Sequence, residues 1–475
     1  MVRYSYQIHF VFGFFNNDMK FHIKLLQTSS LSVGLLWLAC ASQAYGQTEG
    51  DAEPSNSRFS GFATLGVTYH SNQDVGVIIL GSQSKPAYQG LSANLDTALG
   101  LQWDYKLAPA TSITLQGVVR AGEEFEPKLR MAYVKQVLGE NLSVRAGRMR
   151  NPLFFDSDTS EIGYANTMIR TPIPLYTGTT GGHINYIDGL NVQWRKPLDD
   201  FSLAVNANWG GAQGSHFDFT STPSNKFLIN VSGLLNLSVG LTFGDHLIRY
   251  SHSNVGRFTA DTDPPFKTYQ DLTKFSKVLS GVATQLGASG QSAAAQVLVD
   301  RAKLLSVYSA PYDGAQTYDS IGFSTTLAGF GIGGEWTLLN TDTVMLGKVE
   351  AYQLTASYPI GTFTPFISFS SSRRISNWAE SNPITPTGLP GVGSIDSDLA
   401  FIGQQTAQIS KLFDNSMRGV SVGTRWEVAR NMAAKIQYDY LSTRDSQTPG
   451  AFAFSGRSAF DNAVHMLSAS LDVVF

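Results

Sequence analysis

The stretch LDTALGLQWDYK, residues 95–106, decides the fold because its apolar and polar residues alternate one by one. Every second residue belongs to one largely apolar set, which comprises Leu95, Thr97, Leu99, Leu101, Trp103 and Tyr105. Successive side chains of a β-strand point to opposite faces, so this period of two predicts a strand with one apolar and one polar surface. The stretches DFSLAVNANW (200–209) and SLDVVF (470–475) repeat the pattern.

Segments with this alternation recur throughout the chain after Arg58, and matching them to the pattern gives about sixteen strands. The predicted strands are 58–71, 95–106, 111–121, 127–138, 141–150, 188–196, 200–209, 230–243, 246–254, 319–328, 331–340, 348–359, 362–373, 417–428, 431–442 and 463–475. No apolar run of about 18 residues occurs in this part, so no membrane-spanning helix is expected.

The connections between the predicted strands alternate in length. Tight turns with the sequences LAPAT, LGEN, KPLDD, GD, GFG, PIG and ARN join every second pair of strands. The intervening connections are mostly long: 72–94, 151–187, 210–229, 255–318, 374–416 and 443–462, with only 122–126 and 341–347 short. A soluble sandwich has no reason to sort its loops in this way, whereas an antiparallel outer-membrane barrel has short periplasmic turns and long extracellular loops.

Aromatic residues support the same orientation. On the predicted apolar face, those close to the tight turns are Trp103, Tyr105, Trp194, Phe201, Phe243, Tyr358, Phe363, Trp426 and Phe475. Those near the long connections are Tyr69, Trp209 and Tyr440. Two such girdles match the headgroup levels on either side of an apolar band.

Strands in hydrocarbon must close into a ring, because every backbone N–H and C=O there needs a hydrogen-bond partner. With the apolar face outward, the polar face lines the interior, and at sixteen strands that interior is an aqueous channel. The predicted inward charges are mixed: Lys106, Arg120, Lys128, Arg130, Arg145, Arg249, Arg425 and Lys435 with Asp96, Asp104, Glu335, Glu427, Asp439 and Asp472. Selectivity is therefore expected where the passage narrows.

The N-terminal residues 1–46 have the features of an export signal. A short positive region at 19–24 precedes an apolar run at 31–41 and small residues around Ala44, where cleavage is expected. Residues before Met19 are interpreted as an upstream extension, and 47–57 as a short segment before the barrel at 58–475. Bulky Trp37 stands where a lipobox prefers Leu, so lipidation is not expected.

The composition narrows the possible partners. The 475 residues are 43% hydrophobic and 15% charged, as in a folded chain. A formal net charge of −3 offers no basic surface for nucleic acid. The single cysteine cannot form an internal disulfide or a cysteine-rich zinc site. No metal constellation is evident, and neither a metal nor a cofactor is expected.

Several stretches resemble Gram-negative porins of the outer membrane. These are RFSGFATLGV (58–67), LQWDYKLAP (101–109), PKLRMAYVKQVLGENLSVRAGRMRNPLFFDSD (127–158) and LSASLDVVF (467–475). The resemblance implies a 16-stranded all-β barrel of the general-diffusion type, passive passage of small hydrophilic solutes and ions, and a homotrimer among outer-membrane lipid and lipopolysaccharide. It also implies that Phe475 is the signal read by the barrel-assembly machinery.

The same resemblance implies that the loop 151–187 folds into the lumen and carries the constriction. Its charged candidates are Asp156, Asp158, Glu161 and Arg170, and the candidates for the facing wall are Arg120, Arg130 and Arg145. Acidic groups opposite arginines would filter solutes by charge. The alternative is that these charges only solvate a surface loop.

The long connection 255–318 contains a helical pattern. Leu272, Phe275, Leu279, Val282 and Leu286 recur at helical spacing, and an alanine-rich stretch follows after a GASG break. The segment 268–307 therefore either gates the pore mouth or forms a cap that packs on neighbouring loops.

An enzyme, a solute-specific channel and a structural barrel are the alternatives to a general porin. The histidines at 70, 183, 216, 246, 252 and 465 are scattered, and the chain has no G-x-S-x-G elbow in a strand-to-helix context and no HExxH, so no enzyme is expected. A channel specific for phosphate, carboxylates or sugars remains an alternative, as does a structural or adhesion barrel.

Overall fold

The computed structural model describes residues 56–72, 75–79, 83–84, 86–87, 90–177, 186–215, 226–263, 267–444, 452–454 and 462–475. All of them belong to the compact unit Ala52–Phe475. The predicted export signal of residues 1–46, with its start at Met19, lies outside the described residues.

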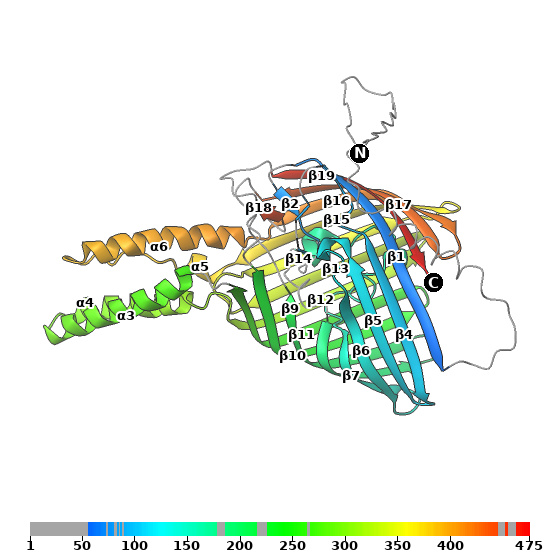
Figure 1. Ribbon diagram of the computed structural model, residues 1–475, viewed down its shortest axis with the longest axis horizontal. Coiled ribbons are helices and arrows are strands. Elements are labelled where there is room, and N and C mark those ends of the chain that lie inside the picture. Colours follow the sequence, from blue (N-terminus) through cyan, green and yellow to red (C-terminus); the bar gives the residue numbers. More distant parts are fainter. Residues whose placement is uncertain are drawn as a thin grey trace, which may run out of the picture. The chain divides into compact units, whose positions relative to one another are not determined.

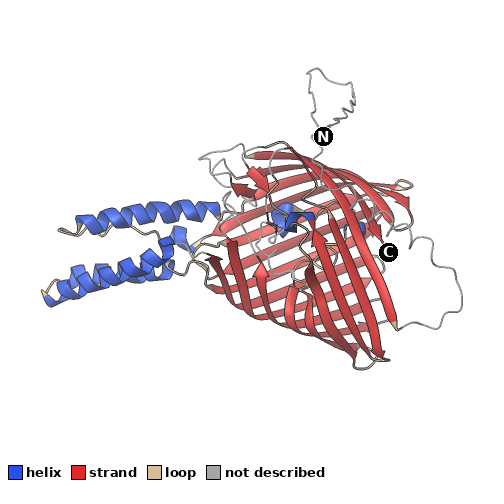
Figure 2. Cartoon of the chain, viewed as in Figure 1, coloured by secondary structure: helices blue, strands red, loops and turns tan. Residues whose placement is uncertain are grey.

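Sixteen long antiparallel strands form the wall of a closed barrel in the described part of the chain (Figures 1 and 2). They are β1 (Ser57–His70), β4 (Ala98–Ala108), β5 (Thr111–Arg120), β6 (Lys128–Val137), β7 (Leu142–Arg150), β8 (Tyr186–Pro197), β9 (Ser202–Ser215), β10 (Lys226–Phe243), β11 (His246–Asp263), β12 (Gly314–Leu327), β13 (Phe330–Thr341), β14 (Lys348–Ser357), β15 (Phe363–Ser376), β16 (Met417–Ala429), β17 (Met432–Thr443) and β19 (Ala463–Val474). Each overlaps one predicted strand, which confirms the predicted fold class.

Each strand of the wall pairs with its neighbours in chain order, and the first and last strands pair with each other. Leu65 of β1 lies opposite Leu471 of β19 in a continuous antiparallel register. Beyond β19, the backbone N–H of Phe475 donates to the carbonyl of Gly61 at 3.0 Å, and the N–H of Gly61 donates back at 2.8 Å. The ring therefore has no free edge, as an apolar surrounding requires.

Short elements complete the wall and its rim. A three-residue strand, β3 (Gly90–Ser92), extends the pairing of β1 at the end with the long connections. At the same end, β2 (Val75–Val77) pairs with β18 (Phe452–Phe454) as a separate two-stranded sheet.

Alternate side chains of the wall face outward and inward, as β10 illustrates. Leu235, Leu237 and Val239 are exposed on the outside, whereas the intervening Asn236 and Ser238 are buried inside. Aromatic rings lie near the tight turns, where Trp103 and Tyr105 stack at 5.4 Å between ring centroids. Phe363 and Trp426 stack there at 5.7 Å, Phe330 and Tyr358 pack at 4.7 Å, and all four rings are exposed on the outside. The outer surface is thus an apolar band with an aromatic border.

The helices lie in the long connections. They are α2 (Ile173–Tyr176), α3 (Lys267–Ala288), α4 (Ser292–Tyr308), α5 (Trp378–Ser381) and α6 (Gly393–Leu412), with short 3₁₀ turns η1 (Ala121–Glu123) and η2 (Gly163–Ala165). None of the helices in the described ranges is long and apolar enough to cross a membrane. The helical pattern predicted within 255–318 corresponds to α3 and α4, whereas α6 was not predicted.

Helices α3, α4 and α6 extend away from the end of the barrel that carries the long connections (Figures 1 and 2). Leu272 and Leu279 of α3, Leu298 and Leu305 of α4 and Leu399 of α6 are all buried and belong to one apolar cluster. Tyr308 donates from its hydroxyl to the carbonyls of Ala379 and Asn382, at 3.1 and 3.0 Å, and so ties α4 to the segment before α6.

We expect a charge on the apolar face to destabilise the barrel. Leu65 is 43% exposed on the outside of β1, between Phe59 and Tyr69. Leu65→Arg is expected to lower the free energy of unfolding by about 2–4 kcal/mol, because an arginine near the bilayer midplane loses its hydration. Urea titration of the protein folded in lipid vesicles measures this change.

The matched control is Thr242→Arg, because Thr242 is exposed on the inside of β10. This variant is expected to unfold like the unmodified chain. An equal loss of stability in the two variants would contradict the assignment of the outer and inner faces.

Candidate functional site

The connection that follows β7 turns into the barrel and contacts the inner wall in three separate places. Its described part runs from Asn151 to Thr177. The partners lie on strands that are far apart around the ring, so this inner loop, residues 151–177, crosses the lumen and does not only cover its mouth.

The first contact is with β11, β12 and β13. The backbone N–H of Phe155 donates to a carboxylate oxygen of Glu335 at 2.7 Å, and the hydroxyl of Tyr176 donates to the other at 2.9 Å. The guanidinium of Arg249 donates to the carbonyls of Phe154 and Phe155 and lies over the Phe155 ring, 5.3 Å from its centroid. Gly322 leaves room for that ring, because a Cβ atom there would lie 2.4 Å from it.

The second contact is formed by Glu161, whose carboxylate is buried against β5, β6 and β7. It lies 3.2 Å from Arg120 and 3.3 Å from Arg130, and it accepts a hydrogen bond from Arg150. Burial alone would raise the pKa of Glu161, but the attraction of Arg150, Arg120 and Arg130 outweighs it and holds the pKa well below its usual range. Glu161 is therefore an anchor that stays charged at neutral pH.

The third contact joins the loop to β16, β17, β19 and β1. The ammonium group of Lys435 donates to the carbonyls of Gly163 and Met168 at 2.6 and 3.0 Å. Only glycine fits at position 163, because a Cβ atom would lie 2.1 Å from the Asp472 carboxylate.

Arg170 completes this third contact. Its guanidinium is buried and lies 2.6 Å from Asp96 and 2.8 Å from Asp439. Burial disfavours its charge, but the two carboxylates raise the pKa of Arg170 above its ordinary value. Removal of Arg170 or of one of its carboxylates would strongly destabilise the fold, because the remaining charge would be buried without a partner.

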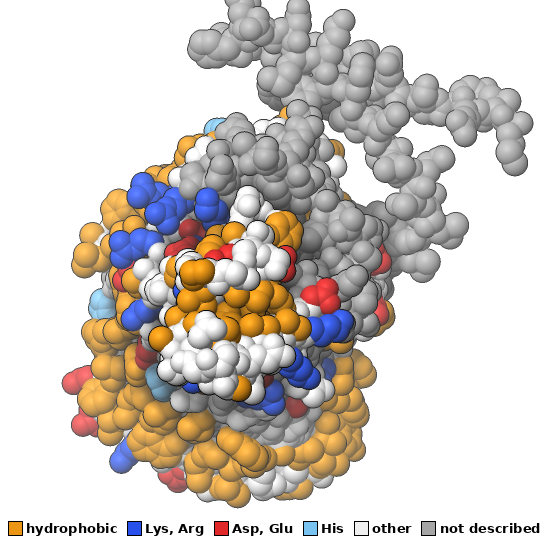
Figure 3. Space-filling model, turned by 90° about the vertical axis from the view of Figure 1, so that its left-hand side faces the viewer, with side chains coloured by type: hydrophobic (Ala, Val, Ile, Leu, Met, Phe, Trp, Pro, Cys, Tyr) orange, Lys and Arg blue, Asp and Glu red, His pale blue; other side chains and the backbone are white. Residues whose placement is uncertain are grey.

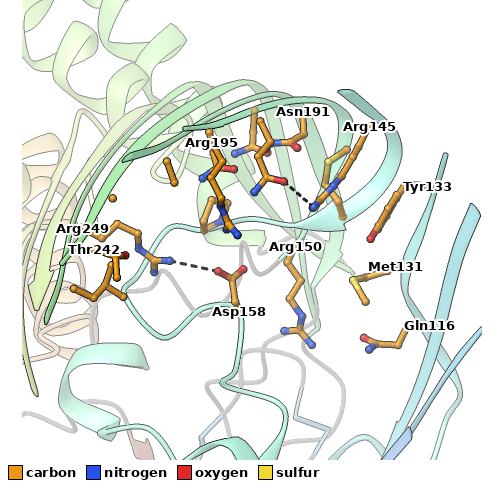
Figure 4. Close-up of a pocket in the computed structure, with 18 of the residues that line it drawn as sticks. Gln116, Met131, Tyr133, Arg145, Arg150, Asp158, Asn191, Arg195, Thr242 and Arg249 are labelled. Carbon is orange, nitrogen blue, oxygen red and sulfur yellow. Dashed lines mark hydrogen bonds and ion pairs between the residues drawn. The ribbon is translucent and has the colours of Figure 1, made fainter. Parts of the chain in front are cut away.

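A cavity of about 660 Å³ remains between the inner loop and the wall (Figure 4). Its lining comes from β4 to β11 on one side and from residues 150–162 on the other. Most lining side chains are polar amides, hydroxyls and arginines. Beside it, Asn191, Asn208 and Asn236 form a chain of hydrogen bonds, each 2.9 Å long, across neighbouring strands.

The charges that line this cavity are mostly positive. They are Arg145, Arg150, Arg195 and Arg249 against the single Asp158 (Figure 4). Arg150 binds Glu161, and Arg249 lies 3.3 Å from Asp158. Arg145 donates to the amide oxygen of Gln193 at 3.1 Å, and Arg195 has no ion pair within the described residues. Two arginines therefore face the cavity without a carboxylate partner in the described part.

The predicted site residues have different roles in this arrangement. Arg120 and Arg130 bind the loop through Glu161, whereas Arg145 faces the cavity. Asp158 also faces the cavity, and Arg170 lies buried on the far side of the loop. The Asp156 backbone N–H donates to Tyr176, and burial raises the pKa of the Asp156 carboxyl.

Arg195 was not predicted as a site residue. The alternation within 188–196 places it on the inner face, and this was the available signal. Arg195 has no acidic partner in the described part of the chain because of where the loop carboxylates lie. The strand pattern does not predict the positions of those carboxylates. Among the described residues, no group of three or more His, Cys, Asp or Glu side chains could hold a metal ion.

Comparison with known proteins gives structural similarities alone. No family model matches the chain, and no curated protein matches it. The anion-selective porin from Comamonas acidovorans is 11% identical, with 89% of this chain and 100% of that chain covered and a TM-score of 0.49. The outer membrane channel DcaP of Acinetobacter baumannii is 11% identical (90% and 100% covered, TM-score 0.48), and OmpF of Salmonella typhi in complex with daunomycin is 12% identical (88% and 97%, TM-score 0.47). At these identities no residue role is transferred to this chain.

We expect Glu161→Gln to release the inner loop from β5–β7. Arg120 and Arg150 would keep no carboxylate partner among the described residues, and loss of one partner of a buried pair costs about 3–5 kcal/mol. Single-channel recordings should show larger and noisier currents than in the unmodified protein. Thermal unfolding of the same preparation should occur at a lower temperature.

The control is Asp158→Asn, whose carboxylate is 61% exposed and, among the described residues, pairs with Arg249 alone. An exposed pair contributes about 1 kcal/mol or less, so loop docking should persist. Since the pKa of Glu161 is lowered, its pairing is fully present above pH of about 4.3 and is lost only in stronger acid. Current noise that already increases between pH 7 and 5 would contradict this anchoring role.

Proposed function

We propose that this chain is an outer-membrane porin, a water-filled channel through which small hydrophilic solutes and ions diffuse passively. The observation that carries the proposal is the polar cavity beside the inner loop, enclosed by a closed barrel with an apolar outer surface. A ring of sixteen strands is wide enough to leave an aqueous lumen after its own side chains are placed. The inner loop then sets the width of the passage.

The arginines of the passage favour anions among the solutes. Arg145 and Arg195 face the cavity with no carboxylate partner in the described residues, and a unit charge at about 4 Å in water contributes about 1 kcal/mol. About 1 kcal/mol for the two arginines together corresponds to a roughly fivefold preference for chloride over potassium, or about twofold for each. The same feature favours the second candidate function, a channel specific for phosphate or carboxylate solutes, over one specific for sugars.

An enzymatic role finds no support in the arrangement of the described histidines. His70 is buried inside the barrel, whereas His252 and His465 lie on the outer face, where they bind Asp319 and Tyr438. A hydrolytic triad would need such groups together at one rim or in the lumen. Transport, in contrast, needs no catalytic group.

The remaining assignments belong to the same proposal. The chain resides in the outer membrane of a Gram-negative bacterium, among lipid and lipopolysaccharide, and assembles as a homotrimer. Phe475 serves the barrel-assembly machinery as its recognition signal, and its position beside Gly61 at the seam of the ring is compatible with that role. No cofactor and no nucleic acid take part.

The test is the reversal potential of the channel in a planar bilayer with a potassium chloride gradient. We expect its sign to indicate anion preference, and Arg145→Gln and Arg195→Gln each to reduce the permeability ratio by roughly twofold, because each removes one unpaired charge. Arg257→Gln, on the exposed rim and paired with Asp313, is the control and should leave the ratio unchanged.

Different results separate the alternatives. A chain that conducts nothing would overturn the channel proposal. Conductance that saturates with phosphate but not with chloride would identify the specific channel. Liposome swelling with sugars of graded size gives an independent size limit for a general pore.

Deletion of residues 268–307 tests whether the helical segment gates the pore. Helices α3 and α4 pack against each other, contact the segment before α6 through Arg301 and Tyr308, and extend away from the barrel end. We therefore expect them to act as a cap, with the single-channel conductance unchanged. Altered open probability in the deletion variant, with the barrel folded as judged by its resistance to heat in detergent, would favour gating.

A further inference from the structure

A second cavity, of about 420 Å³, lies where β15, β16 and β17 end at the rim with the long connections. Its lining is unusual in composition: Arg373, Arg374, Arg418 and Arg444, the hydroxyl side chains Ser371, Ser372, Ser416, Ser442 and Thr443, and Met417. None of the described residues that line it carries a carboxylate. Lysine and arginine side chains also gather along one side of this rim when the barrel is viewed from its helical end (Figure 3).

The strand register places the exposed part of this cluster on the outer face. Ser371 lies opposite Arg418, which in turn lies opposite Ser442. Arg373 and Arg444 follow two residues beyond the two serines, so the alternation of side chains points them the same way. We call Ser371, Arg373, Arg418, Ser442 and Arg444 the rim patch.

The rim patch directly adjoins the apolar band. On the same outer face, Phe369 precedes Ser371 by two residues and is 50% exposed, and Tyr440 precedes Ser442 by two residues and is 38% exposed. Basic and hydroxyl groups thus lie above a surface of aromatic and aliphatic side chains. Along the strands, a basic polar surface is thus followed by an apolar one. This arrangement is complementary to a molecule with an anionic head group and apolar tails.

The arginines of the rim patch keep hydrogen-bond donors for a ligand. Arg418 is exposed and has no ion pair among the described residues. Arg373 binds Glu350 at 3.0 Å and is 70% exposed, and Arg444 is 66% exposed at 3.5 Å from Asp414. Ion pairs this exposed are weak, and a planar guanidinium has five N–H donors in a fork that matches phosphate.

Arg374 has a different role in the same cavity. Its side chain is buried and donates to the carbonyl of Ser410 at 2.7 Å and to Glu380, while Asp414 lies 3.7 Å away. It fixes the chain before β16 and so shapes the floor of the cavity. It is excluded from the test below, because its loss would disturb the fold.

Two other arginines at this end, Arg148 and Arg257, are already neutralised. Arg148 binds Asp188 through two hydrogen bonds of 2.7 Å, and Arg257 binds Asp313 through two of 2.9 and 2.6 Å. In these bidentate pairs the fork of the guanidinium is occupied by a carboxylate. The rim patch differs because its three arginines have only Glu350 and Asp414 as carboxylate partners in the described part of the chain.

We infer that the rim patch binds the phosphate group of a phosphorylated glycolipid in the outer leaflet, whose acyl chains lie along the apolar face of β15–β17. The inference rests on the proposed outer-membrane location, which places the long connections outside the cell. Arg373, Arg418 and Arg444 provide charge-assisted hydrogen bonds, and Ser371 and Ser442 provide hydroxyl donors between them.

The experiment uses the full chain folded in detergent and diphosphorylated lipid A as the probe, with bound lipid counted by native mass spectrometry. The triple variant Arg373→Gln, Arg418→Gln, Arg444→Gln is expected to bind lipid A at least tenfold more weakly. Arg418→Gln alone is expected to account for a several-fold loss. Arg257→Gln is the matched control, since it removes an exposed but fully paired arginine from the same rim, and it should bind normally.

Four results would overturn the inference. The first is equal binding of lipid A that lacks its phosphates, and the second is undiminished binding by the triple variant. The third is displacement of lipid A by inorganic phosphate at equal concentration, which would identify a free-anion site with no part for the acyl chains. Protection of the patch by a second copy of the chain, without lipid, would equally exclude a lipid site.

The same variants separate this inference from the proposed function. The rim patch lies outside the lumen, so the triple variant should keep the conductance and ion preference of the unmodified channel. A chain that binds lipid A through these arginines but conducts nothing would retain the lipid site and overturn the channel. Resistance to heat in detergent verifies that each variant is folded.

Discussion

The need to satisfy every backbone hydrogen bond in an apolar surrounding governs this structure. A single open edge in hydrocarbon would leave a row of N–H and C=O groups unpaired, at several kcal/mol each. The pairing of β1 with β19, continued by Phe475 and Gly61, removes that edge. Once the ring is closed, only one orientation of the alternating side chains fits the membrane: the apolar set faces the lipid and the polar set faces the lumen.

The strands could be predicted from sequence because each of them has one lipid-facing and one lumen-facing side. The prediction was less accurate where contacts beyond the sheet decide. Leu95 was assigned to a lipid-facing strand, but it precedes β4 and is buried with Ile173 and Met417. Strands β9, β10 and β11 extend well past their predicted ends, because their pairing continues above the apolar band, where the alternation no longer marks a strand.

The site was less predictable than the wall. The loop charges at 156, 158, 161 and 170 were found, since charged residues in a long connection are conspicuous. Which wall residues these charges contact depends on how the loop crosses the lumen. No local sequence pattern predicts the path of the loop. Glu161 neutralises arginines of the wall from which the loop emerges, so Arg120 and Arg130 hold the loop in place. Of the four arginines that line the passage, Arg145 and Arg195 are not reached by a described loop carboxylate.

The inner loop also has a consequence for the order of assembly. It leaves the chain after β7, yet its anchors include Glu335, Lys435 and Asp439, which are separated from it by more than a hundred residues. Contacts over such separations form late in folding, because the intervening chain must first be ordered. A partly assembled barrel would therefore have a wide lumen without the inner loop across it. The lumen would reach its final diameter only when the last hairpins are in position. A narrow lumen therefore indicates that the barrel has finished folding.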